Sequence, residues 1–341
     1  MHILILVLGF YLLTKGADFF VEGAVSLSKK LKIPALIIGL TVVAFGTSAP
    51  ELFVSVVSSI KGATEITMEN IVGSNIANVL LILGASAVIF PLSTHSKVII
   101  REIPFMFLTA LALWFVADDI IFGGGEQSVI SRGDAFVLLL LFSIFLYYLI
   151  SEAIKAKNDK KLQKEFEEIE GVKVYSKPIV ILLFMLGGIL MLTAGGKLVV
   201  DSAIFIATYM GISETLAGLT IVAVGSSLPE LVTTIMAVRK KESDVAIGNI
   251  VGSCIFNTIF VLGIAGVIAP LPFDSMLRTD MMIFIFAAII LFVATITDRK
   301  ITRPEGFRRI FPVFKLFSVF NFYYFKGLNE KNRISFASRK F

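Results

Sequence analysis

Long apolar segments separated by short polar joints recur along almost the whole chain of 341 residues. A transmembrane helix needs about 20 mostly apolar residues, and most of these segments reach that length. The predicted segments are 3–28, 34–60, 70–91, 101–117, 134–152, 178–208, 213–238, 245–270 and 279–297. The pattern therefore predicts an all-α polytopic membrane protein.

The composition supports this interpretation, with 56% hydrophobic and 17% charged residues. The net charge of +5 is distributed among the joints, so it indicates a lipid bilayer rather than a nucleic acid as the partner. Cys254 is the only cysteine, which excludes a disulfide framework and a cysteine-rich metal site. The first apolar segment follows no basic residue and lacks a small-residue cleavage pattern, so we expect a retained transmembrane helix.

One long polar joint, rich in Lys and Glu, divides the chain into two similar halves. The predicted units are a first half at 1–152, a linker loop at 153–177, a second half at 178–325 and a polar tail at 326–341. A further segment, 307–325, carries Arg308, Arg309, Pro312 and Lys315. These residues favour an interfacial or imperfect tenth helix over a regular span.

Lys and Arg are distributed unequally between alternate joints. One side holds twenty of them, seven within the linker, and the other side holds only Lys61, Arg132 and Arg278. An excess of these residues marks the cytoplasmic side of a membrane protein. The distribution predicts a multi-pass protein of the cell membrane with its N-terminus outside and its central loop in the cytoplasm.

The most informative pattern is an internal repeat with an offset of 179 residues. At this offset GLTVVAFGTSAPEL (39–52) aligns with GLTIVAVGSSLPEL (218–231), and NIVGSNIAN (70–78) aligns with NIVGSCIFN (249–257). Five predicted segments precede the second copy, so the two copies cross the membrane in opposite directions. Inverted repeats around broken helices are typical of secondary transporters, whose binding site lies at the repeat interface near the midplane. We therefore predict two inverted-topology repeats of five transmembrane helices.

The motif GTSAPE (46–51) places helix-breaking residues beside oxygen atoms. Gly46 weakens a helix, and Pro50 removes an N–H group and clashes with the carbonyl of Gly46. The carbonyls around Ala44 to Thr47 are thus candidates to leave the helical ladder, and in hydrocarbon a freed carbonyl needs another partner. Further oxygens follow within one turn, on Thr47, Ser48 and Glu51. Such an all-oxygen cluster suits a hard cation, Ca²⁺ or Na⁺.

The second copy, GSSLPE (225–230), repeats each of these elements, with Ser226 in the place of the threonine. Inverted symmetry would bring Glu51 and Glu230 together at mid-depth, where each charge costs about 2.5 to 3.5 kcal/mol. One divalent ion, two monovalent ions or two protons would neutralise the pair. A single Pro or Gly in a membrane helix usually produces only a kink, but duplication of the whole set favours an ion path.

The second motif adds neutral oxygen ligands. Ser74 and Asn78 lie four residues apart on one helical face, and Ser253 and Asn257 repeat that spacing. Together the two motifs resemble the alpha repeats of the calcium/cation antiporter superfamily, most closely the prokaryotic sodium/calcium exchanger type. The resemblance extends to about residue 306 and implies ten helices, with cations bound between the second, third, seventh and eighth.

The resemblance also implies roles for individual residues, carried over by motif position. The calcium ligands would be Thr47, Glu51, Ser226 and Glu230. The flanking sodium positions would use Ser48, Ser74, Ser227 and Ser253 with the carbonyls of Ala44 and Ala223, and Asn78 and Asn257 would line the centre. Some members have Asp where Asn257 stands, so this centre carries one less potential charge and the ion stoichiometry stays open.

These features predict a secondary antiporter that exchanges Na⁺ for Ca²⁺ by alternating access, with no cofactor besides the transported ions. The resemblance further implies that the first and sixth segments slide across a rigid core. H⁺/Ca²⁺ exchange is the first alternative, because buried carboxylates also bind protons. A passive cation channel is a second alternative. An intramembrane enzyme is the weakest, since the chain has no HExxH, Ser-His or catalytic cysteine arrangement.

Overall fold

The computed structural model describes residues 2–93, 99–158, 175–210, 225–298 and 300–301. This part is helical almost throughout, which confirms the predicted all-α membrane fold. The segments predicted at 307–325 and 326–341 lie outside the described residues, as does most of the linker. Within the described ranges, six helices are long and apolar enough to span a membrane, or seven when one bent pair is counted as a single span.

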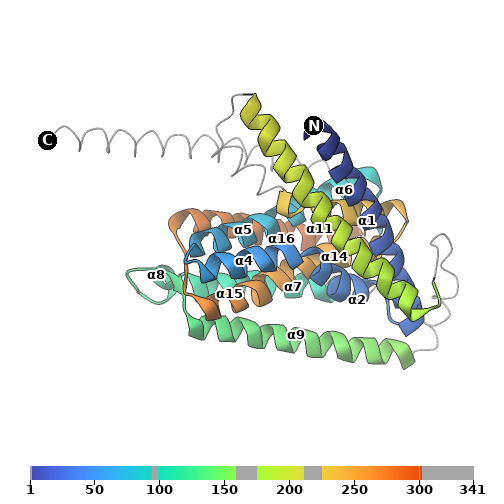
Figure 1. Cartoon of the computed structure of the whole chain (residues 1–341). Helices are drawn as coiled ribbons and strands as arrows, with labels where there is room; N and C mark the ends of the chain where they lie inside the picture. Colours follow the sequence, from blue (N-terminus) through green and yellow to red (C-terminus); the bar gives the residue numbers. More distant parts are fainter. Residues whose placement is uncertain (1, 94–98, 159–174, 211–224, 299, 302–341) are drawn as a thin grey trace.

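Two long helices, α1 (His2–Leu31) and α11 (Pro178–Tyr209), lie side by side across the rest of the bundle (Figure 1). They run antiparallel, because Gly9 approaches Gly195 whereas Gly23 approaches Met185. Glycines bring the two backbones together: a Cβ on Gly16 would lie 2.9 Å from the carbonyl oxygen of Gly188. The pair therefore forms a closely packed unit of its own.

From residue 49 onward, the inner elements of the two halves correspond one to one at the 179-residue offset, whereas the positions equivalent to α2 and η1 lie outside the described residues. The first set is α2 (Ala35–Ile38), η1 (Gly39–Val43), α3 (Ala44–Thr47), α4 (Ala49–Ile60), α5 (Thr64–Ile76), η2 (Ala77–Ile82) and α6 (Leu83–Ile89). The second set is α13 (Leu228–Arg239), α14 (Ser243–Ile255), η3 (Phe256–Val261) and α15 (Leu262–Ile268). From α4 to α6 each element begins and ends 179 residues before its counterpart, so equivalent sequences adopt equivalent local structure.

The outer elements complete the bundle. They are α7 (Ile99–Ala117), α8 (Asp119–Phe122), α9 (Arg132–Asn158) and α16 (Ser275–Asp298). Two antiparallel pairs of short strands join distant segments: β1 (Leu92–Ser93) pairs with β4 (Lys300–Ile301), and β2 (Val129–Ile130) pairs with β3 (Leu271–Pro272). These strands were not expected from the apolar pattern, because each is only two residues long.

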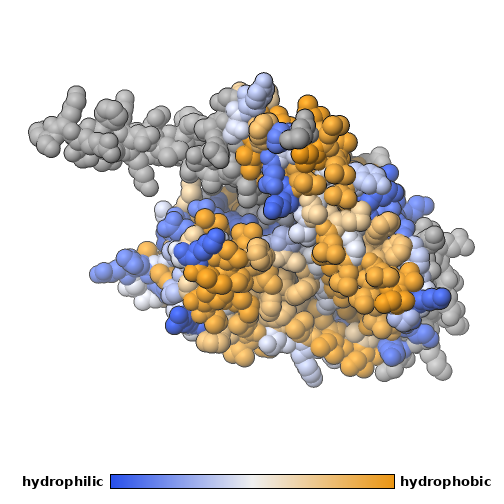
Figure 2. Space-filling view, viewed as in Figure 1, coloured by the Kyte–Doolittle hydropathy of each residue, from blue (hydrophilic) through white to orange (hydrophobic). Residues whose placement is uncertain are grey.

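Burial distinguishes the core from the lipid-facing surface. Helix α14 is buried along almost its whole length, whereas α9 runs along one edge of the bundle with many of its apolar residues exposed (Figure 1). Figure 2 shows apolar residues over much of the visible face, with hydrophilic residues gathered toward its edges. Exposed apolar side chains in this number indicate a surface that faces lipid.

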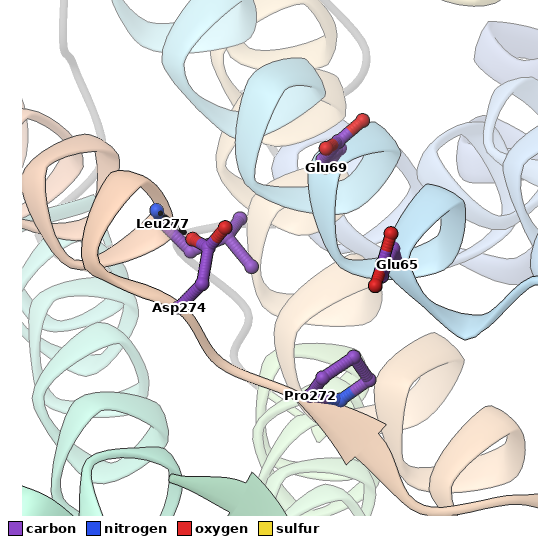
Figure 3. A pocket seen from close by; sticks show the side chains of 5 residues that line it. All are labelled: Glu65, Glu69, Pro272, Asp274 and Leu277. Carbon is purple, nitrogen blue, oxygen red and sulfur yellow. Dashed lines mark hydrogen bonds between the residues drawn. The ribbon is translucent and has the colours of Figure 1, made fainter. Parts of the chain in front are cut away.

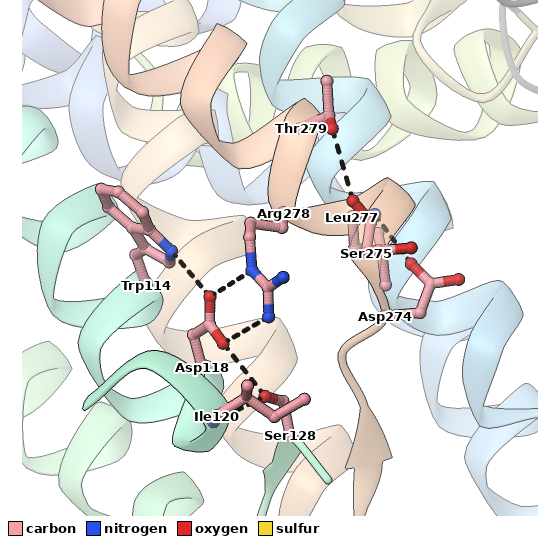
Figure 4. Close-up of polar contacts among 9 residues, drawn as sticks. All are labelled: Trp114, Asp118, Ile120, Ser128, Asp274, Ser275, Leu277, Arg278 and Thr279. Carbon is pink, nitrogen blue, oxygen red and sulfur yellow. Dashed lines mark hydrogen bonds and ion pairs between the residues drawn. The ribbon is translucent and has the colours of Figure 1, made fainter. Parts of the chain in front are cut away.

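An ion pair joins the start of α16 to the end of α7 (Figure 4). Arg278 donates hydrogen bonds of 2.6 and 2.8 Å to the two carboxylate oxygens of Asp118. Trp114 and Ser128 donate to the same carboxylate at 3.3 and 3.1 Å. The pKa of Asp118 is lowered to about 2 by the hydrogen bonds from Arg278, although burial opposes this effect. The cluster therefore holds an ionised carboxylate at one end of the bundle.

Candidate cation site

Each GTSAPE-type motif breaks a helix at its serine. Ser48 adopts φ −84° and ψ 8°, and the helices on either side of it are bent by 47°. Ser227 adopts φ −87° and ψ 7°, and α13 begins at the next residue. The prolines lie in the first turn of the new helices, where a missing N–H is tolerated. The prediction of a broken helix is confirmed at the first motif; at the second, Ser227 departs from helical geometry in the same way, and residues 211–224 lie outside the described ranges.

The break places each glutamate in the first turn of a helix. Glu51 lies in α4 and Glu230 in α13, and both side chains are buried. The N-terminus of a helix carries a partial positive charge, which favours a carboxylate there. The hydroxyl of Ser48 donates to Oε1 of Glu230 at 3.0 Å and so joins the first motif to the second. The two carboxylates interact electrostatically, as the sequence predicts.

Several buried oxygens around this junction accept no hydrogen bond within the described ranges. They are both carboxylate oxygens of Glu51, Oε2 of Glu230, Oγ of Ser253 and Oδ1 of Asn78 and Asn257. A buried polar atom without a partner is costly, and most such atoms in proteins are satisfied. The amide nitrogen of Asn78 is likewise without a hydrogen-bond partner in this part of the chain, but the oxygens named are the ligand type that Na⁺ and Ca²⁺ prefer. The residues present therefore fit a transported hard cation.

The NIVGS-type motifs supply the neutral part of this set. Ser74 lies in α5 and Ser253 in α14, while Asn78 and Asn257 lie in the π-helical segments η2 and η3. A π-helical turn inside an α-helix often marks a functional site. The hydroxyl of Ser227 donates to Oγ of Ser74 at 3.3 Å, which links the second broken helix to α5. Each motif of one half thus meets a motif of the other.

The hydroxyls predicted to bind Ca²⁺ both contact asparagines that the sequence interpretation missed. Thr47 donates to Oδ1 of Asn249 at 3.0 Å, and Ser226 donates to Oδ1 of Asn70 at 3.4 Å. These asparagines are the first residues of the two NIVGS-type motifs, at equivalent places in the repeat. Their recurrence at the 179-residue offset could have marked them as candidate site residues, but only the later serine and asparagine of each motif were predicted to be ligands.

A third asparagine, Asn75, was also missed. Its amide nitrogen donates to the hydroxyl of Thr258 at 2.9 Å, and its amide oxygen accepts from Nδ2 of Asn257 at 3.5 Å. Cys254 occupies the equivalent place in the second half, so the repeat could not have indicated it. The contact with Asn75 uses the nitrogen of Asn257 and leaves its Oδ1 among the unpartnered oxygens.

The two predicted carbonyl ligands have different outcomes. The carbonyl of Ala44 accepts the N–H of Ser48 at 3.0 Å, so it stays within the helical ladder. The prediction that this carbonyl leaves the ladder is wrong, because the helix continues to Ser48 before it bends. A carbonyl oxygen has two lone pairs, and the second is still able to face an ion. Ala223 lies outside the described residues.

A separate acidic pocket lies at the start of α5 and of α16 (Figure 3). Glu65, Glu69 and Asp274 line it with Pro272 and Leu277, and its volume is about 50 Å³. Within the described segments, no group of three or more His, Cys, Asp or Glu side chains is arranged to hold a metal ion.

A cationic residue ties α1 to the end of α13. Lys240 forms ion pairs of 2.5 Å with Asp18 and 3.0 Å with Glu22, and the hydroxyl of Tyr175 donates to Glu22 at 3.2 Å. Burial lowers the pKa of Lys240, but its hydrogen bonds to the two carboxylates outweigh burial and raise it overall. Lys240 therefore stays charged and connects the α1–α11 pair to the helices that carry the site.

Comparison with known proteins gives matches along most of the chain. The family model described as sodium/calcium exchanger protein matches residues 1–151 and 180–322. The sodium/calcium exchanger MaX1 of Methanosarcina acetivorans is 34% identical over 336 residues, which cover 89% of this chain and 94% of that protein. The inner membrane protein YrbG of Escherichia coli is 37% identical over 272 residues, 80% of this chain and 81% of YrbG. A solved structure of the sodium-calcium exchanger NCX_Mj is 28% identical, with a TM-score of 0.78, and covers 93% of this chain and 99% of that chain.

Proposed function

Because the chain belongs to the sodium/calcium exchanger protein family, we propose that it exchanges Na⁺ for Ca²⁺ across the cell membrane by alternating access. The family and the fold are those of a cation/Ca²⁺ antiporter in a membrane and not those of an enzyme class. The observation that carries the proposal is the junction of the two broken helices. There, Ser48 of one motif bonds to Glu230 of the other, beside a Glu51 carboxylate that has no hydrogen-bond partner among the described residues.

The proposed ligands are those that the sequence predicts. Thr47, Glu51, Ser226 and Glu230 would hold Ca²⁺; Ser48, Ser74, Ser227, Ser253 and the carbonyls of Ala44 and Ala223 would hold Na⁺, with Asn78 and Asn257 at the centre. Two carboxylates give this site a charge of −2 when both are ionised. One Ca²⁺ neutralises that charge, and so do two Na⁺.

This charge balance supplies the coupling. Ca²⁺ and Na⁺ compete for the same carboxylates, so binding of one ion displaces the other. An empty site would carry two buried negative charges through the middle of the membrane, which is strongly unfavourable. The change of access therefore occurs with the site occupied by one kind of ion or the other, and the two fluxes are coupled.

We assign the movement to α1 and α11 as one unit. The glycine contacts hold these two helices against each other. Sliding of the pair over the other helices would have to break the ion pairs of Lys240 with Asp18 and Glu22 of α1. We further propose that residues 1–152 and 178–325 are inverted repeats joined by a cytoplasmic loop at 153–177, with residues 326–341 as a tail and the N-terminus outside.

The test is ⁴⁵Ca²⁺ uptake by proteoliposomes that contain the full chain. Vesicles loaded with Na⁺ and diluted into Na⁺-free buffer should accumulate Ca²⁺, whereas vesicles loaded with choline should not. Uptake driven by a pH gradient without Na⁺ would replace this proposal with H⁺/Ca²⁺ exchange. Ca²⁺ flux that needs no counter-ion would indicate a passive channel instead.

A further inference from the structure

The two hydroxyls proposed to bind Ca²⁺ share a feature that their role as ligands does not explain. Each donates to an asparagine of the opposite half, Thr47 to Asn249 at 3.0 Å and Ser226 to Asn70 at 3.4 Å. Asn249 follows Asn70 by 179 residues, so the two contacts are equivalent in the repeat. The Thr47–Asn249 pair is the shorter, and both of its side chains are fully buried.

A hydroxyl that binds a cation must direct its proton elsewhere, because it has one proton and binds metal through oxygen lone pairs. Two other acceptors lie near the Thr47 proton. The carbonyl of Ala44 is 3.3 Å from Oγ1, and the carboxyl of Glu230 interacts with the same hydroxyl. Either alternative would occupy a lone pair that an ion needs. A threonine in a helix readily bonds back to its own backbone in this way.

The amide of Asn249 is itself held in place. Its nitrogen donates to the hydroxyl of Thr234 at 3.0 Å, and Thr234 is fully buried in α13. Helix α14 packs closely here, since a Cβ on Gly252 would lie 2.6 Å from the carbonyl oxygen of Leu40. The chain of contacts thus runs from Thr234 through Asn249 to Thr47. With its nitrogen on Thr234, Asn249 presents its oxygen to Thr47.

We propose that Asn249 is a positioning residue for cation binding and that Thr234 fixes its orientation. The amide oxygen of Asn249 accepts the hydrogen bond from the Thr47 hydroxyl. The Thr47 oxygen, the second lone pair of the Ala44 carbonyl and the Glu230 carboxylate then remain available to the ion. This inference rests on the proposed function in one respect, namely that Thr47 and its neighbours are ligands. It adds what orients them: two residues, Asn249 and Thr234, that do not themselves bind the ion.

The test is equilibrium binding of ⁴⁵Ca²⁺ to the purified full chain, with Thr234→Val as the main variant. Removal of the Thr234 hydroxyl frees the amide of Asn249 to rotate, so the dissociation constant for Ca²⁺ should rise about 5-fold, and about 10-fold in Asn249→Leu. Thr234→Ser keeps the acceptor and should bind like the wild type. The matched control is Thr208→Val on α11, whose hydroxyl bonds only to the helix carbonyls of Ile204 and Phe205 among the contacts described.

A double-mutant cycle separates positioning from general damage. In a Thr47→Val background the hydroxyl is gone, so Asn249→Leu should change the dissociation constant less than 2-fold. The inference is overturned if Asn249→Leu raises the dissociation constant for Ca²⁺ by the same factor with and without the Thr47 hydroxyl. It is also overturned if folded Thr234→Val binds Ca²⁺ with wild-type affinity. If Asn249→Leu does not fold, the Thr234→Val and Thr234→Ser pair decides. Failure of Na⁺-driven uptake by the wild type would instead refute the proposed coupling, and it leaves this binding comparison intact.

Discussion

At the scale of single residues, the proposed site depends most on the carboxylate of Glu51. Glu51→Gln keeps the size of the side chain but removes its charge, and we expect Na⁺-driven Ca²⁺ uptake to fall by on the order of 100-fold, because a ligand matters at least as much as the groups that support it. Glu65→Gln is the control, since Glu65 is exposed in the first turn of α5. Uptake by Glu51→Gln at the wild-type rate would show that Glu51 is not a ligand of the transported ion.

The sequence was most informative about residues that occur twice. Glu51 and Glu230 could be paired because a charge in an apolar segment is costly and both copies retain it. Asn249 could not be assigned to Thr47 in the same way, because their contact depends on how closely α14 approaches α3. The repeat could not indicate Asn75, because the equivalent residue of the second half is Cys254. Candidate ligands could thus be selected from their chemistry, whereas the contacts between residues could not be predicted.

At the scale of elements, the packing of α1 on α11 leaves room for a methyl group at one of two adjacent glycines of α11 but not at the other. A Cβ on Gly188 would lie 2.7 Å from Cβ of Phe20 and 2.8 Å from the carbonyl oxygen of Gly16, whereas a Cβ on Gly187 has no described heavy atom within 4 Å. Gly188→Ala should therefore separate the helices and reduce transport by about 10-fold or more, at a cost of about 1 to 3 kcal/mol. Gly187→Ala should transport normally. Equal activity of the two variants, measured by ⁴⁵Ca²⁺ uptake, would show that close packing of this pair is unnecessary.

A second element-scale prediction concerns the attachment of α16 to α7. Arg278→Met leaves the buried carboxylate of Asp118 without its cation, so the free energy of unfolding at pH 7 should fall by about 2 to 3 kcal/mol. The control Arg132→Met removes an exposed guanidinium whose described contact is the carbonyl of Ile268 at 3.4 Å, and it should cost less than about 0.5 kcal/mol. Thermal unfolding in detergent measures both.

The pH dependence of that ion pair follows from the pKa of Asp118, which is lowered to about 2. A carboxyl whose folded pKa lies below its unfolded value of about 3.9 stabilises the fold above that value. Its contribution is lost as the pH falls from about 4 toward 2. Asp118→Asn should lack this loss, so its melting temperature should depend less on pH in this range than that of the wild type.

Elements could be predicted where residues within the element determine its structure, and could not be predicted where contacts with a distant segment determine it. The breaks after Ser48 and Ser227 follow from Gly and Pro in each motif, and their geometry is nearly the same. The π-helical turns η2 and η3 have no such local signal, because NVLLI and NTIFV are ordinary apolar runs. The strand pairs β1–β4 and β2–β3 join residues far apart in the chain, so two-residue strands could not be identified from sequence alone.

At the scale of the whole molecule, the apolar pattern predicted the membrane fold and its principal helices because the bilayer fixes their length and polarity. The relation of α1 and α11 to the other helices was implied only by the family resemblance, since glycine spacing alone does not select a partner helix. The orientation of the molecule in the membrane rests on the distribution of Lys and Arg and stays a prediction.

Cysteine labelling tests that orientation, because the chain has one native cysteine, Cys254, and it is buried. Glu126→Cys places an exposed thiol in the loop after α8, on the side predicted to lie outside, and Lys177→Cys places one before α11, on the side predicted to be cytoplasmic. A membrane-impermeant maleimide should label the first variant in intact cells and the second only after permeabilisation, while the native chain takes up little label in either case. The reverse order would invert the topology, and labelling of both variants in intact cells would place the two loops on the same outer side, contrary to an odd number of spans between them.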